Sequence, residues 1–177
     1  MSILTYEEVI LEWALAELLS PTWRSDPHWS DEISKLLRAK VLELGADSLN
    51  PDERTWLSGR LLQFRALIIG TYGPRSSWRF NKRVASAESI SRFGVIDSFR
   101  IPGSSMDDLS TKVRYEDYFQ MRDRVQEIID SKRPERYSPI AVSRKDRVPI
   151  LIEGYKRVFS AMWTSTAWLE IIFCEPT

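Results

Sequence analysis

The sequence predicts an α+β fold, with a helical subdomain at residues 1–72, a basic linker at 73–92 and a small mixed-sheet domain at 93–177. Apolar residues repeat at helical spacing through the first part of the chain, and short apolar runs typical of strands dominate the last part. Hydrophobic residues make up 43% of the chain, which is enough to fill a core and argues against wholesale disorder.

Two helices are expected before residue 45. Thr5 and Glu8 match a capping box at the start of the first, which Pro21 stops. The second is expected from about residue 31 to residue 44, with Ser30 as its N-cap and Gly45 closing it. The loop between these helices carries Trp23, His28 and Trp29, which would form a binding surface or pin the loop to the core.

The third helix has the clearest start signal. Asn50 is the N-cap, Pro51 occupies the first helical position and Glu53 completes a capping box. The apolar repeat then continues to Gly70, where the helix is expected to end.

The stretch from residue 73 to residue 92 is basic and is interpreted as a linker or as the edge of the second unit. Four cations alternate with aromatic residues there, and the candidate nucleic-acid contacts are Arg75, Trp78, Arg79, Lys82 and Arg83. The competing interpretation is a solvated connector whose aromatic side chains pack against the helical unit.

The second domain is expected to alternate strands and helices. In chain order, we expect a strand near 95–99, a polar loop at 104–112, a helix at 115–129, strands at 139–142 and 148–152, a helix opened by Glu153-Gly154, and a final strand at 169–174.

The start of that last helix carries the strongest candidate chemistry. The first backbone N–H groups of a helix lack partners, and the helix dipole adds positive charge there. Gly154 would let an anion approach the backbone, while Lys156 and Arg157 add full charges. Glu153 would hold a metal ion or accept a proton. The same residues also fit an ordinary strand–glycine–helix junction.

Two motifs resemble the ParB/sulfiredoxin superfamily, namely Pro-Ile-Ala-Val at 139–142 and Gly-Tyr-Lys-Arg-Val-Phe-Ser-Ala at 154–161. The resemblance covers about residues 93–177 and is strongest from 138 to 174. It implies a small domain that binds ATP or CTP with Mg²⁺. Sulfiredoxins have a catalytic cysteine and ParB proteins a glutamate where this chain has Tyr155, so sulfinic-acid repair is not expected.

The resemblance also implies roles for individual residues. Glu153 would be the catalytic acid or base and the metal ligand. The implied nucleotide contacts are Gly154, Tyr155, Lys156 and Arg157, with Ser104 and Ser105 in the preceding loop.

Composition excludes several other classes. The chain has 25 basic and 25 acidic residues, so it is not a generic polyanion binder, although residues 1–70 carry a net charge of −4 and residues 71–177 of +4. One cysteine excludes an intrachain disulfide and argues against a zinc site built from cysteines. The expected protein is soluble and cytoplasmic, with no signal peptide and no membrane span.

Two functions remain open from the sequence. The first is an ATP-type nucleotide-binding protein, with ATPase or DNA nuclease activity left open, that acts as an accessory of a plasmid or other mobile element. The second is a non-enzymatic inhibitor or adaptor that binds a protein partner through the tryptophan-containing helical subdomain.

Overall fold

The structure is a computed structural model that describes residues 2–20, 27–96, 105–116, 121–131, 137–144, 147–165 and 168–177. Within these residues it contains eight α-helices and a five-stranded mixed sheet, which confirms the α+β expectation. The chain forms two compact units, one made of Glu7–Thr71 and the other of Met1–Tyr6 with Tyr72–Thr177.

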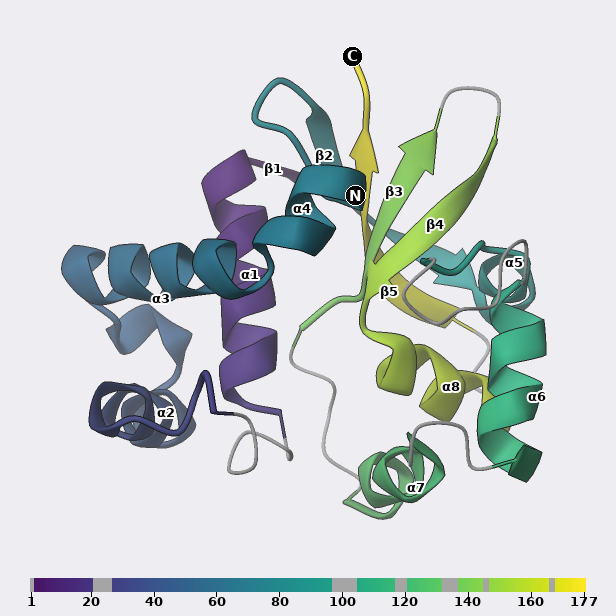
Figure 1. Cartoon of the computed structure of the whole chain (residues 1–177), viewed down its shortest axis with the longest axis horizontal. Helices are drawn as coiled ribbons and strands as arrows, with labels where there is room; N and C mark the ends of the chain where they lie inside the picture. Colours follow the sequence, from purple (N-terminus) through teal and green to yellow (C-terminus); the bar gives the residue numbers. More distant parts are fainter. Residues whose placement is uncertain are drawn as a thin grey trace. The chain divides into compact units, whose positions relative to one another are not determined.

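The helical unit is built around a helix with a large buried apolar surface. Its helices are α1 (Tyr6–Leu18), α2 (Glu32–Leu44), α3 (Pro51–Phe64) and α4 (Ala66–Tyr72), with a 3-10 turn at Ala46–Ser48 (Figure 1). Six residues of α1 are buried, including Trp13, which is 1% exposed. Burial of this kind contributes about 1.5–3 kcal/mol per large apolar side chain, so α1 anchors the unit.

Capping explains where two of these helices begin. Asn50 and Glu53 form the reciprocal capping box of α3, as the sequence predicts. α2 is capped by Asp31 and not by Ser30, because the Asp31 carboxylate accepts the Ser34 N–H at 3.0 Å. The third predicted helix is interrupted at Arg65, so that α3 and α4 are separate helices.

The second unit contains the sheet, whose strand order is β1-β2-β5-β3-β4. The strands are β1 (Ser2–Leu4), β2 (Arg79–Ser86), β3 (Ile140–Arg144), β4 (Arg147–Glu153) and β5 (Trp168–Glu175). β3 runs parallel to β5, and the other neighbouring pairs are antiparallel. The buried residues Ile140, Ile172 and Cys174 lie at the centre of this sheet.

The linker interpretation of residues 73–92 is wrong. Residues 79–86 form β2, which pairs with β1 on one side and along its whole length with β5 on the other. Phe80 is buried, and its ring centroid lies 6.1 Å from that of Tyr6. Residues 79–86 are therefore an internal strand, which is followed directly by α5 (Ala87–Ser91).

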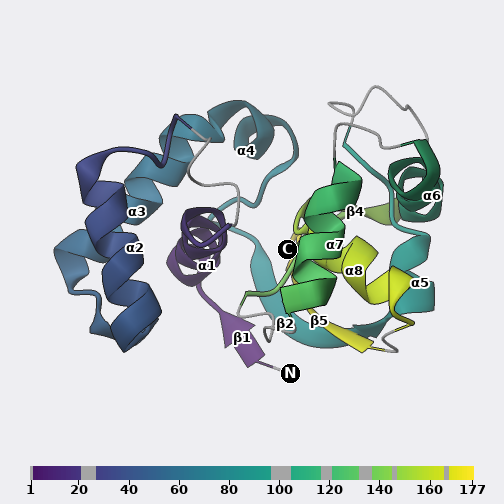
Figure 2. The ribbon, with the colours of Figure 1, turned by 90° about the horizontal axis from the view of Figure 1, so that it is seen from below.

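Four helices gather beside one another in this unit, namely α5, α6 (Met106–Glu116), α7 (Met121–Ser131) and α8 (Tyr155–Trp163) (Figure 2). The predicted polar loop at 104–112 is wrong from residue 106 onward, because α6 begins there. Of the strand predicted near 95–99, residues 97–99 lie outside the described residues, and just before it Gly94 makes isolated bridges to Ser105 and to Ile150. In the described parts of the chain, no helix is both long and apolar enough to cross a membrane.

Candidate functional site

The candidate anion site lies where β4 ends and α8 begins, and we call residues 153–157 the α8 corner. Gly154 is the N-cap of α8 and has a φ of 90°, a left-handed conformation that glycine adopts without strain. A Cβ placed on Gly154 would lie 2.7 Å from the Cβ of Pro139. Pro139 thus occupies the space that a side chain at position 154 would need.

Arg157 is engaged by the chain itself. Its guanidinium donates a hydrogen bond to the Tyr137 carbonyl and lies 3.5 Å from the Glu153 carboxylate. Only 12% of its side chain is exposed, so a phosphate would have to compete with these internal partners. Glu153 and Arg157, predicted to act on a bound nucleotide, instead lie beside each other.

Tyr155 faces the interior. Its hydroxyl donates to the Leu151 carbonyl and accepts the Ile96 N–H at 3.3 Å. Burial is the largest cause that raises the pKa of this phenol above its ordinary value, and the Glu153 charge also raises it. The Tyr155 side chain therefore ties the segment around residue 96 to β4, which leaves only the backbone of this residue for a ligand.

The remaining residues predicted to contact the nucleotide do not form a phosphate-binding site with the α8 corner. Lys156 is half-buried, and Ser104 lies outside the described residues. Ser105 caps α6, since its hydroxyl accepts the Asp108 N–H at 3.2 Å, and its own N–H donates to the Asp108 carboxylate at 2.9 Å. Among the residues that the structure describes, no group of three or more His, Cys, Asp or Glu side chains is gathered to hold a metal near Glu153 or elsewhere.

The predicted nucleic-acid residues do not share one face. Successive side chains of a strand point to opposite sides, so Lys82 faces away from Arg79 and Arg83. Lys82 pairs with Glu170 at 3.4 Å, and Arg83 pairs with Glu175 and stacks 4.1 Å over the Phe173 ring.

The other two members of the set, Arg75 and Trp78, precede β2. Arg75 is exposed and Trp78 is half-buried. Two of the four basic charges of the predicted set are thus used within the sheet, which weakens the predicted nucleic-acid surface.

The predicted binding surface of the helical unit is also changed. Trp13 and Trp29 are almost fully buried, and Trp29 packs edge-on against Phe64 at 6.2 Å. The His28 ring lies on Phe64 as well, with ring centroids 3.8 Å apart. Trp23 lies outside the described residues. These contacts pin the loop to the core, which is the second of the two roles considered for it.

A surface that the sequence interpretation missed lies on α2. Ile33, Leu36 and Leu44 share one side of the helix and are 51%, 69% and 64% exposed, and we call them the α2 face. The sequence does contain a signal for this surface, because α2 has more large aliphatic residues than one buried stripe requires. Leu37 and Val41 supply that buried stripe, which leaves the α2 face in solvent.

No family model, curated protein or solved structure matches this chain. The resemblance to the ParB/sulfiredoxin superfamily therefore stays a prediction that rests on the motifs at 139–142 and 154–161.

Proposed function

We propose that the protein acts as a non-enzymatic adaptor or inhibitor that binds another protein through the α2 face. The supporting observation is that Ile33, Leu36 and Leu44 are each more than half exposed on one helix. Isolated exposed aliphatic residues are ordinary, whereas a contiguous apolar surface marks an interaction site.

The energetics of such a surface favour docking. Fully burying one large aliphatic side chain contributes about 1.5–3 kcal/mol. Three such side chains on a short helix therefore provide several kcal/mol toward association, before the cost of ordering the two partners. The buried residues of α2 already hold the helix in place, so the α2 face is not needed for the fold.

The α8 corner supports catalysis less well, since Arg157 and Glu153 interact with each other and Arg157 also binds the Tyr137 carbonyl. A protein-binding role requires nothing from these residues beyond their packing. It corresponds to the second of the two functions that the sequence leaves open. A setting in a mobile element rests on the family resemblance alone.

Co-elution with a partner tests this proposal. The purified chain is mixed with an extract of the cells in which the gene occurs and then separated by size exclusion. We expect the wild type and Leu67→Asp to shift to a larger complex and Leu36→Asp to remain alone. Leu67 is 82% exposed on α4 and controls for general stickiness. Equal behaviour of the two variants would reject the proposal.

A second candidate is nucleotide binding at the α8 corner. One observation favours it, which is that no side chain caps the start of α8. Uncapped first-turn N–H groups next to Lys156 are a ready site for an anion. Thermal shift with ATP, CTP and Mg²⁺ tests this candidate, because a ligand at a hundred times its Kd stabilises by about 2.7 kcal/mol. No shift with any nucleotide would dismiss it.

A further inference from the structure

We propose that the partner presents a basic amphipathic helix, which lies in the groove between α2 and α3. This inference rests on the proposed function, because it names the chemistry of what binds the α2 face. Three features of the groove support it, namely its lining, its length and its uncancelled charge.

The groove is a hollow of about 350 Å³ on the helical unit. It is lined by Ile33, Leu36, Leu37, Asp52, Glu53 and Trp56. The apolar members come from both helices and include Ile33 and Leu36, two of the three residues of the α2 face. A groove bounded by two helices suits a third helix, whose side-chain ridges fit between theirs. The described part of this unit offers no strand edge to an extended peptide.

The length of the surface also fits a helix. From Ile33 to Leu44, α2 advances about 16 Å at 1.5 Å per residue. That distance accommodates about three turns of a partner helix, with apolar anchors spaced at i, i+3 or i+4, and i+7. Leu44 adds an apolar residue beyond the hollow, separated from Leu36 by Lys40, which is paired with Glu53.

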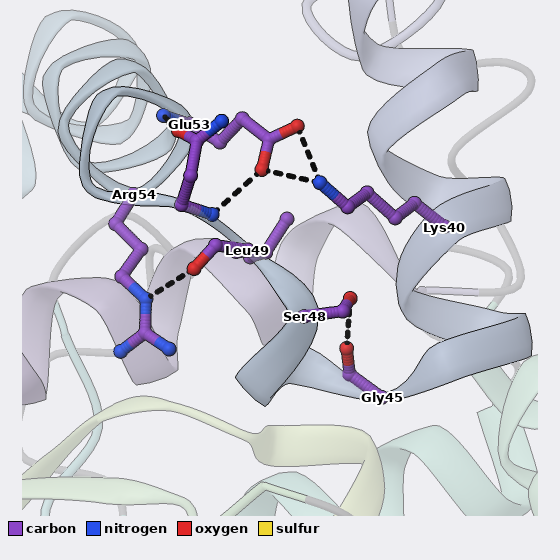
Figure 3. A network of polar contacts seen from close by, with 7 residues as sticks. Lys40, Gly45, Ser48, Leu49, Glu53 and Arg54 are labelled. Carbon is purple, nitrogen blue, oxygen red and sulfur yellow. Dashed lines mark hydrogen bonds and ion pairs between the residues drawn. The ribbon is translucent and has the colours of Figure 1, made fainter.

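The basic residues near the groove are already neutralised. Lys40 donates to both oxygens of Glu53, at 2.8 and 2.7 Å, and the Glu53 carboxylate also accepts the Asn50 N–H at 2.8 Å (Figure 3). Arg60 is held by Asp31 and the His28 carbonyl, with its guanidinium 5.2 Å from the centre of the Trp56 ring.

Two acidic residues near the groove are not neutralised in this way. Asp52 lines the groove, and Glu43 lies two turns after Leu36 on the same side of α2. Both are exposed, and neither has an ion-pair partner among the residues that the structure describes. Residues 7–71 carry seven basic and eleven acidic residues, a net charge of −4. Lysine and arginine flanking the apolar anchors of a partner would complement this rim.

The test uses two synthetic helical peptides with the same leucine anchors, one with lysine and one with glutamate at every flanking position. Binding to the full chain is followed by fluorescence anisotropy at about 50 mM and about 500 mM salt, where screening differs strongly. We expect the lysine peptide to bind at least about tenfold tighter at low salt, with the preference shrinking at high salt.

Variants locate the site. Leu36→Asp should abolish binding of the lysine peptide, while Asp52→Asn with Glu43→Gln should reduce its preference several-fold. Leu67→Asp should leave binding unchanged. The inference would be overturned if the lysine peptide bound the Leu36→Asp variant and the Asp52→Asn/Glu43→Gln variant as tightly as it binds the wild type.

Two other outcomes separate this inference from the proposed function. Equal binding of both peptides that is lost in Leu36→Asp would overturn the basic partner and leave the α2 face as a docking surface. A wild-type chain that dimerises in solution, and becomes monomeric as Leu36→Asp, would show that a second copy occupies the groove and would also overturn the inference.

Discussion

Gly154 and Pro139 are packed so closely that the chain has no room for a side chain between them. The Cβ of any other residue at position 154 would lie 2.7 Å from the Pro139 Cβ and 2.8 Å from its Cα. Pro139 precedes β3 and Gly154 follows β4, so this contact closes the end of the β3–β4 pair at which α8 begins. Both residues belong to the motifs that suggested a nucleotide site, but here they make a packing contact.

We expect Gly154→Ala to destabilise the protein strongly. A left-handed conformation costs a residue with a Cβ about 1–2 kcal/mol. Overlap with Pro139 adds the cost of overpacking, about 1–3 kcal/mol. Urea unfolding followed by circular dichroism measures the loss.

Gly59 provides the matched control for this substitution. It lies inside α3, and an added Cβ there would meet nothing within 4 Å. Gly59→Ala should therefore stabilise by about 0.5–1 kcal/mol. In a Pro139→Gly background, which removes the Pro139 Cβ but keeps its Cα, the cost of Gly154→Ala should fall only in part. Wild-type stability in Gly154→Ala, accompanied by loss of a nucleotide-induced thermal shift, would instead support a phosphate site.

Arg157→Ala should lower stability by about 1.5–3 kcal/mol, the range for hydrogen bonds to charged groups. The Tyr137 carbonyl loses its charged donor in this variant, and Glu153 loses its partner. Arg92→Ala is the control, because Arg92 also pairs with a glutamate four residues earlier but is 73% exposed. An exposed pair of this kind contributes at most about 0.5 kcal/mol. Similar small losses in both variants would contradict the internal role of Arg157.

Acid should weaken the helical unit only at low pH. The Lys40 ammonium and then the Asn50 N–H lower the pKa of Glu53 from its ordinary value of 4.5. The pKa of Asp31, ordinarily 3.8, is raised by burial but lowered more by the bonds from Ser34 and the charge of Arg60.

Carboxylates with lowered folded pKa values stabilise the fold above their unfolded pKa, and that contribution is lost as the pH falls through the folded value. The free energy of unfolding should therefore stay level from about pH 7 to about pH 5 and fall below about pH 4.5. Urea melts across this range measure it. The Glu53→Gln variant should have a lower free energy of unfolding than the wild type near neutral pH. Its free energy of unfolding should also fall less than that of the wild type as the pH is lowered. A decline that occurs mainly between pH 7 and pH 5 would refute this explanation.

Local signals in the sequence predicted local structure well. The Asn50–Glu53 capping box depends on residues three apart, and its bonds are present. Ser105 and Asp108 form a similar pair at the start of α6, and Met106, Leu109 and Val113 follow at helical spacing, among polar residues that are also typical of a loop. The polar composition of this segment explains the wrong loop prediction over α6.

Relationships between distant residues could not be predicted in the same way. β2 forms because residues 79–86 pair with the distant strand β5, for example Phe80 with Cys174. Patterns of local spacing in the sequence do not predict a pairing between residues so far apart. The position of the α8 start was predicted correctly, yet the inward course of Arg157 depends on a carbonyl twenty residues earlier. The α2 face was missed because helical periodicity identifies apolar positions without showing which of them the rest of the unit covers.

Site-directed photo-crosslinking tests the central claim most directly. Benzoylphenylalanine is placed at position 36, on the α2 face, or at position 35, and each chain is irradiated in the cells in which the gene occurs. We expect one discrete adduct of constant mass from position 36, lost when Ile33→Asp is added, and little from position 35. Equal adduct patterns from both positions, or an adduct at position 36 that persists in Ile33→Asp, would contradict docking through the α2 face.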